Sequence, residues 1–163
     1  MSRLYAAFVM GQGGWLFSAA FAAIAPRAQA LGFETDVYRY TEIARLRTNV
    51  GMKRQRGYKT ALCGYSLGVS TITELQHEPG ETQFDLLLAV AASSLGDNYP
   101  ITKRTKRSVL WAGPDFLSDA GKNLGFTETH EVAFVPIPVL IHLLMPSLVT
   151  DGVLVELAKL KGN

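Results

Sequence analysis

The sequence predicts an α/β fold, a three-layer α/β/α sandwich around a mostly parallel sheet of about six strands. Three observations predict this fold. Short runs rich in apolar and β-branched residues alternate with helical patterns along the chain. The links between them are short, as expected where helices connect parallel strands. Of the 163 residues, 48% are hydrophobic and 18% charged, so residues 1–163 are expected to form a single domain with one enclosed core.

The first half of the chain contains three predicted strands and two predicted helices. Strands are expected over residues 4–10, 33–40 and 58–63, and helices over residues 15–31 and 41–57. Gly32 and Gly57 follow the two helical patterns, and glycine commonly ends a helix because it accepts a positive φ.

The second half continues the alternation. A helix is expected over residues 69–77, before the break at Pro79. Strands are expected over residues 84–92, 108–112 and 131–135, and the first of these is the most apolar and is predicted to be central. Leu148, Val153, Leu157 and Leu160 give the last helix an apolar stripe.

Basic residues occur in two runs, although the net charge is only +2. The runs contain Arg45, Arg47, Lys53, Arg54, Arg56 and Lys59, then Lys103, Arg104, Lys106 and Arg107. Neither run has the interleaved aromatic residues or zinc-ligand spacing of common nucleic-acid modules. We therefore interpret them as solvated faces and expect no nucleic-acid partner.

The N-terminal segment and the single cysteine bear on the cellular compartment. Residues 1–30 resemble a signal peptide that ends in Ala28-Gln29-Ala30, but four residues from Gly11 interrupt the apolar stretch. Cleavage would also remove a strand and a helix that the fold needs. Because Cys63 is the only cysteine, no internal disulfide forms. We expect a cytoplasmic protein without a transmembrane segment, and secretion is the less favoured alternative.

The segment Gly64-Tyr65-Ser66-Leu67-Gly68 fits the pattern G-x-S-x-G between a predicted strand and a predicted helix. In this context the serine lies on a tight turn at the carboxyl edge of a sheet, and the glycines leave room for neighbouring backbone. Ser66 is therefore the candidate nucleophile.

A serine nucleophile needs a base, and the chain has three histidines. His77 is about 16 Å along the helix from Ser66, at 1.5 Å per residue. His130 precedes the predicted last strand and is expected at the opposite edge of the sheet. His142 follows that strand on an apolar loop at the same edge as Ser66, so we predict that His142 is the general base.

The acid that would orient His142 has two main candidates, Asp115 and Asp97, and Asp119 is a less favoured third. Asp115 follows the strand over residues 108–112 and gives the chain order Ser, Asp, His. Asp97 follows the preceding strand and is the alternative acid. Both could instead be ordinary turn residues.

The oxyanion hole is expected from the N–H of Leu67 and from the glycine-rich loop after the first strand, where Gln12 or Gly13 would be the second donor. This loop could alternatively bind a dinucleotide, but Leu16 stands where the third glycine would be needed, and Asp36 lies inside the second strand. The sequence has no nucleotide-binding P-loop and no zinc-ligand pattern, so no cofactor and no metal are predicted.

With these motifs placed, the chain resembles the small α/β-hydrolases, lipase- or esterase-like proteins of bacteria and their phages. The matching segments are MGQGGWLFSAAFAAIAPRAQALGFET, LCGYSLGVSTITEL and IHLLMPSLVTDGVLVELAKL. The resemblance implies Ser66 as nucleophile, His142 as base and a minimal hydrolase fold without a cap domain. Relatives often carry Asp-Pro where this chain has Ala91-Ala92-Ser93-Ser94, and Tyr65 replaces a common histidine.

The predicted function is a serine hydrolase that cleaves carboxylic esters or thioesters of a small-molecule or lipid-like substrate. Two alternatives stay open. One is a catalytically silent hydrolase fold that acts as a binding or structural protein, and the other is a phage hydrolase directed at the cell envelope. A homo-oligomer is compatible with the sequence.

Overall fold

The computed structural model describes residues 2–12, 19–79, 83–113, 120–132 and 138–162. The strands are β1 (Arg3–Met10), β2 (Phe33–Arg39), β3 (Tyr58–Tyr65), β4 (Leu86–Val90), β5 (Ser108–Ala112) and β6 (Glu128–Glu131). The helices are α2 (Ile24–Ala30), α3 (Ile43–Gln55), α4 (Leu67–Leu75) and α5 (Pro138–Gly162).

The strands form one six-stranded sheet in the order β2-β1-β3-β4-β5-β6, and every neighbouring pair is parallel. The chain moves outward from β1 to β2, and then crosses back to β3 on the other side of β1. The strand order therefore reverses between β1 and β3. In open α/β sheets, the crevice at the carboxyl ends of two such strands is the usual place for a ligand.

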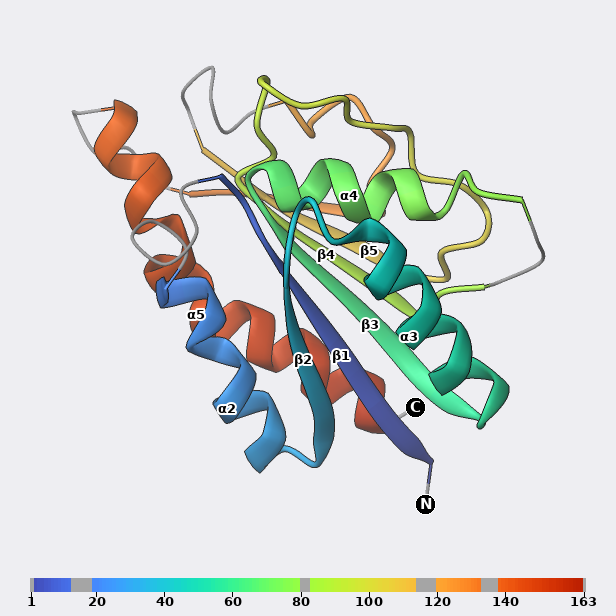
Figure 1. Cartoon of the computed structure of the whole chain (residues 1–163). Coiled ribbons are helices and arrows are strands. Elements are labelled where there is room, and N and C mark those ends of the chain that lie inside the picture. Colours follow the sequence, from blue (N-terminus) through green and yellow to red (C-terminus); the bar gives the residue numbers. More distant parts are fainter. Residues whose placement is uncertain (1, 13–18, 80–82, 114–119, 133–137, 163) are drawn as a thin grey trace.

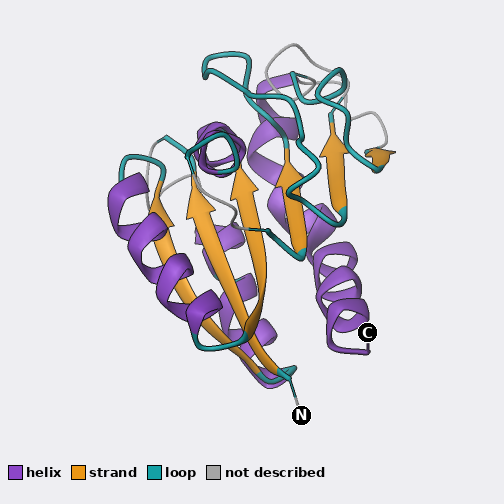
Figure 2. Ribbon diagram, turned by 90° about the vertical axis from the view of Figure 1, so that its right-hand side faces the viewer, coloured by secondary structure: helices purple, strands orange, loops and turns teal. Residues whose placement is uncertain are grey.

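Helices cover both faces of the sheet, as the three-layer prediction required. Helices α3 and α4 lie on one face, and α2 and α5 lie on the other (Figures 1 and 2). The side chains of β1 alternate between the two layers: Ala6 and Phe8 pack with α2 and α5, whereas Ala7 and Val9 pack with α3 and α4. Burial on both faces explains why the strands are near-continuous apolar runs.

Helix α5 runs antiparallel to the strands, so its first turns lie at the carboxyl edge of the sheet (Figure 1). Its apolar stripe includes Met145, Val149, Val153 and Leu157, which are buried against the sheet. The stripe predicted for the last helix is therefore confirmed from Val153 on, whereas Leu148 is exposed.

The last strand and the last helix differ from their predictions. Strand β6 ends at Glu131, where the predicted strand was to begin, and residues 133–137 lie outside the described residues. Helix α5 begins at Pro138, so the segment predicted as an apolar loop is helical. Proline suits the first position of a helix because the N–H that it lacks would have no partner there.

The helix predicted over residues 15–31 is described only in part. Residues 19–22 and α2 are helical, and residues 13–18 lie outside the described residues. None of the helices in the described ranges combines the length and the apolar character that a membrane span requires.

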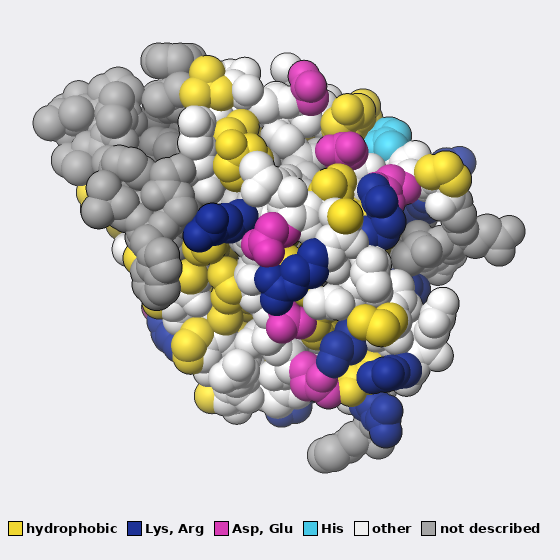
Figure 3. All heavy atoms as spheres, in the orientation of Figure 1, with side chains coloured by type: hydrophobic (Ala, Val, Ile, Leu, Met, Phe, Trp, Pro, Cys, Tyr) yellow, Lys and Arg dark blue, Asp and Glu magenta, His cyan; other side chains and the backbone are white. Residues whose placement is uncertain are grey.

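Charged side chains of both signs are interspersed on the face covered by α3 and α4 (Figure 3). Arg45 pairs with Glu42 within this layer, and Arg47 forms an ion pair with Glu78. These pairs support the interpretation of the first basic run as a solvated face.

Candidate active site

The turn between β3 and α4 has the shape predicted for a nucleophile turn. Ser66 is its single residue, with φ 55° and ψ −122°. A positive φ is strained for a residue that has a Cβ. Backbone hydrogen bonds hold the turn on both sides: Ser66 N donates to Val90 O at 3.0 Å, and Val69 N donates to Ser66 O at 3.0 Å.

The two glycines of the motif are required by close backbone contacts. A Cβ on Gly68 would lie 2.1 Å from the carbonyl oxygen of Val9, in β1. A Cβ on Gly64 would lie 2.7 Å from the carbonyl oxygen of Gly68. Each glycine therefore lets one element approach another, and together they bring the first turn of α4 against the end of β1.

A third glycine brings the loop after β1 to the serine. Gly11 directly follows β1, and a Cβ on it would lie 2.7 Å from Ser66 Cβ and 3.1 Å from Ser66 Oγ. Gln12 is the next residue and is exposed. Leu67 directly follows Ser66 as the first residue of α4, where a backbone N–H has no partner inside its own helix. The structure thus brings Ser66 together with the two backbone segments that were predicted to form an oxyanion hole.

His142 lies inside α5, and its side chain is outside what the structure describes. Position 142 comes three and seven residues before Met145 and Val149, which are buried. The first turns of α5 are at the carboxyl edge (Figure 1), which is the edge predicted for His142.

The two candidate acids are placed differently. Asp115 lies outside the described residues. Asp97 is exposed in the loop after β4, next to Gly96, which packs on Leu67 and Ser70 at the first turn of α4. Asn98 fixes this loop, because its Oδ1 accepts a hydrogen bond from Ser70 Oγ at 3.1 Å.

The prediction for His130 was wrong in its location. His130 lies within β6 and pairs with Trp111 in the register; their ring centroids are 5.6 Å apart. Its Nε2 is 2.9 Å from Glu128 Oε1. The register joins Trp111 through Val90 to Tyr65, so His130 is three strands from the serine strand, or about 14 Å at strand spacing. His130 is thus too distant to reach Ser66 directly.

His77 follows α4 at the end remote from Ser66, as predicted, and its Nε2 lies 2.7 Å from Pro100 O.

Cys63 is buried in β3, and burial raises the pKa of its thiol. The phenol ring of Tyr65 lies in the core, 5.7 Å from the ring of Phe21, and burial raises its pKa. Asp36 accepts a hydrogen bond from Tyr5 OH at 3.0 Å within the sheet layer.

Sequence reasoning missed one strained residue near the site. Ala91 follows β4 with φ 49°, and its N–H donates to Trp111 O at 2.9 Å. Alanine has no preference for positive φ, so no sequence pattern could have identified this turn.

An apolar groove of about 490 Å³ lies along α2 and the strands β1 and β2. Its lining includes Met10, which directly precedes Gly11, together with Ala22 and Pro26 and with Val37 of β2. In the described part of the chain, no three His, Cys, Asp or Glu side chains are grouped as metal ligands.

Two solved structures share this arrangement of strands and helices. The esterase domain of a protein from Rhodothermus marinus superposes with a TM-score of 0.66 at 12% identity, over 96% of this chain and 86% of that one. A protein from Xanthomonas campestris pv. campestris assigned to the alpha/beta superfamily of hydrolases superposes with a TM-score of 0.63 at 16% identity, over 98% and 99%. The chain therefore has an α/β-hydrolase-like fold. Comparison of the sequence itself matches no family model and no curated protein.

Proposed function

We propose that this protein is a serine hydrolase that cleaves carboxylic esters or thioesters through an acyl-enzyme on Ser66. The observation that carries the proposal is the strained backbone of Ser66, together with the close approach of Gly11, which leaves no room for a Cβ beside the Ser66 side chain. A strained serine between a strand and a helix presents its hydroxyl at the carboxyl edge of the sheet, where Ser66 is 7% exposed. The α/β-hydrolase-like fold is consistent with this role.

In the proposed mechanism, Ser66 Oγ attacks the acyl carbonyl while His142 accepts the hydroxyl proton. The N–H groups of Leu67 and Gln12 donate to the oxygen that becomes negatively charged. His142 then gives the proton to the leaving alkoxide or thiolate, and the acyl group stays on Ser66. A water molecule next attacks the acyl-enzyme, again with His142 as base, and releases the carboxylic acid. The mechanism requires no cofactor.

The acyl group is proposed to be apolar. The groove that starts at Met10 is lined mainly by apolar side chains of β1, β2 and the helical segment that contains Ala22. Its volume of about 490 Å³ lies in the usual range for small-molecule sites. A small-molecule or lipid-like ester with an acyl chain directed toward β2 would use this surface.

Labelling with a fluorophosphonate tests the nucleophile. The probe phosphonylates an activated serine and releases fluoride, so we expect one adduct, located on Ser66 by peptide mass spectrometry. Ser66→Ala should abolish the adduct, and Ser70→Ala, which removes another serine of α4, should retain it. If the folded wild-type protein gives no adduct between pH 6 and 9, the proposal fails and the catalytically silent fold is the better description.

The acid of the site is tested by a pair of substitutions. We expect Asp115→Ala to lower kcat for p-nitrophenyl butyrate by about 10³- to 10⁴-fold, because the histidine loses its orienting carboxylate. Asp97→Ala should change kcat by less than about threefold. The opposite result assigns the role to Asp97, and equal, small effects of both would show that no aspartate acts there.

A further inference from the structure

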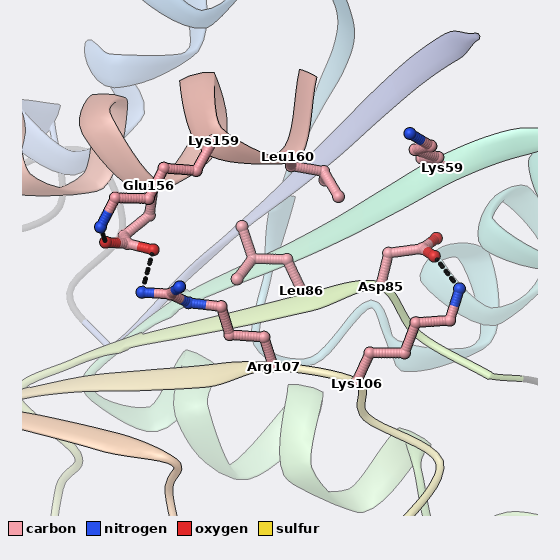
Figure 4. Close-up of a pocket in the computed structure, with 8 residues that line it drawn as sticks. All are labelled: Lys59, Asp85, Leu86, Lys106, Arg107, Glu156, Lys159 and Leu160. Atoms are coloured by element: carbon pink, nitrogen blue, oxygen red, sulfur yellow. Dashed lines mark hydrogen bonds and ion pairs between the residues drawn. The ribbon is translucent and has the colours of Figure 1, made fainter. Parts of the chain in front are cut away.

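A second cavity opens at the amino-terminal edge of the sheet, the edge opposite Ser66. It has a volume of about 330 Å³ and lies between the starts of β3, β4 and β5 and the last turns of α5 (Figure 4). Four basic and two acidic side chains line it, which gives the lining a charge of +2. The nucleophile turn contributes no residue to this cavity, so the two sites are separate.

The two carboxylates are buried and form ion pairs with basic side chains, although Glu156 Oε2 accepts no hydrogen bond from the described residues. The Asp85 side chain is 9% exposed; its Oδ1 accepts from Lys106 Nζ at 2.7 Å, and its Oδ2 accepts from Thr60 N at 2.9 Å. The Glu156 side chain is 5% exposed, 2.6 Å from Lys159 Nζ and 2.8 Å from Arg107 Nη2. Buried carboxylates need such partners because desolvation otherwise disfavours their charge.

The basic side chains keep unused donors after this pairing. Lys59 Nζ forms no hydrogen bond or ion pair with any residue in the described ranges. Arg107 Nε is buried and likewise has no hydrogen-bond partner among the described residues. Lys106 and Lys159 each carry three donors, of which one is committed to a carboxylate. An entering anion would therefore meet free ammonium donors of the lysines without displacing an existing ion pair, whereas Arg107 Nε is buried.

The centre of the cavity is apolar. Leu86 lies between the ion pairs of Asp85 and those of Glu156, and Leu160 faces Leu86 from α5 (Figure 4). A ligand that fits must thus combine a strong negative charge with an apolar group. A phosphate monoester has a charge near −2 at neutral pH, which matches the charge of the lining.

We propose that this cavity binds a small organic phosphate monoester. Lys59 and Lys106 hold the phosphate oxygens, and the organic group lies against Leu86 and Leu160. Lys59 lies at the start of β3 and Lys106 lies just before β5, so the two lysines flank the start of β4, which lies between these strands. Each ammonium group is at the end of a flexible four-carbon stem, which lets it turn toward an oxygen held over β4.

Isothermal titration calorimetry of the full chain with phenyl phosphate tests this proposal. At constant ionic strength we expect phenyl phosphate to bind at least tenfold more tightly than benzoate, which has one charge, or inorganic phosphate, which has no apolar group. Lys59→Gln should weaken phenyl phosphate at least tenfold, whereas Lys103→Gln, which removes an exposed lysine outside the cavity, should leave it unchanged.

A second variant separates the two halves of the ligand. Leu160→Ala should weaken phenyl phosphate severalfold and leave inorganic phosphate unaffected. Thermal unfolding of each variant shows that it is folded. Equal binding of phenyl phosphate and benzoate, or equal effects of Lys59→Gln and Lys103→Gln, would overturn the proposal. Ser66→Ala should bind as the wild type does, so this test is independent of the proposed hydrolase activity.

Discussion

At Ser66 the backbone adopts a conformation that glycine reaches without strain. Strain of this kind amounts to about 1–3 kcal/mol for a residue with a Cβ. Ser66→Ala and Ser66→Gly both remove the hydroxyl, but only the glycine variant also removes the Cβ. The comparison of the two variants therefore isolates the backbone contribution from the contacts of the hydroxyl.

We expect Ser66→Gly to be more stable than Ser66→Ala by about 1 kcal/mol in urea unfolding at pH 7. Both variants should lack fluorophosphonate labelling. A glycine variant less stable than the alanine variant would mean that the turn imposes no strain on a Cβ.

Gly68 carries the closest backbone approach of the site. The methyl group of Gly68→Ala would lie 2.1 Å from Val9 O, so α4 must move away from β1. We expect a loss of about 1–3 kcal/mol in the free energy of unfolding and a loss of labelling at Ser66.

The matched control is Gly51→Ala, within α3. A Cβ at this position meets no atom within 4 Å, and alanine favours the helix, so stability should rise by about 0.5–1 kcal/mol. Equal changes in the free energy of unfolding for Gly68→Ala and Gly51→Ala would show that Gly68 does not shape the turn.

At the scale of elements, patterns that depend on burial were predicted well from the sequence. β5 was predicted with its observed bounds, and the turn at Ser66 was predicted from G-x-S-x-G together with the strand before it. Buried strands and glycine contacts leave local signals, because both restrict side-chain type at each position.

The edge of the sheet was predicted less well. β6 reads Glu-Thr-His-Glu and is largely exposed, so it lacks the apolar run by which the other strands were recognised. The apolar run that follows β6 led to the prediction of a strand over residues 131–135. His130 was therefore placed before the strand, although its ring packs on Trp111 inside the sheet. Pairing with β5 is a tertiary interaction that local sequence does not encode.

Substitution of the two histidines near this end of the sheet tests which element, α5 or β6, supplies the base. We expect His142→Ala to lower kcat for p-nitrophenyl butyrate by about 10⁴-fold or more, because Ser66 would lose its proposed base. His130→Ala should stay within about tenfold of the wild type, since β4 and β5 separate it from the serine strand. The reverse order of effects would assign the base to β6.

At the scale of the whole molecule, Asp85 links the start of β4 to β3, to α3 and to the segment before β5. It accepts hydrogen bonds from Thr60 N, Lys106 Nζ and, at 3.3 Å, Arg54 Nη1. Burial alone would raise the pKa of Asp85, but the hydrogen bonds from Lys106 and Thr60 hold this pKa below its usual range. A lowered pKa stabilises the folded state above the unfolded value of about 3.9, and this stabilisation is lost as the pH falls through the folded pKa.

We therefore expect Asp85→Asn to lower the free energy of unfolding by about 1.5–3 kcal/mol at pH 7. The difference from the wild type should shrink steadily as the pH falls below about 4. Chemical unfolding at a series of pH values measures both quantities. Asp97→Asn, at an exposed carboxylate, should stay within about 0.5 kcal/mol of the wild type throughout. A difference for Asp85→Asn that is independent of pH would show that its charge is not what stabilises the contact.

The conformation of Ser66 also has an evolutionary consequence. Small domains are stable by only about 5–15 kcal/mol, so a strained turn takes up a noticeable share of the margin against unfolding. A single-residue change to glycine would return that share, and nothing would oppose the change in a lineage that does not need the hydroxyl. The strain at Ser66 is thus a cost in stability that the proposed role of its hydroxyl would offset.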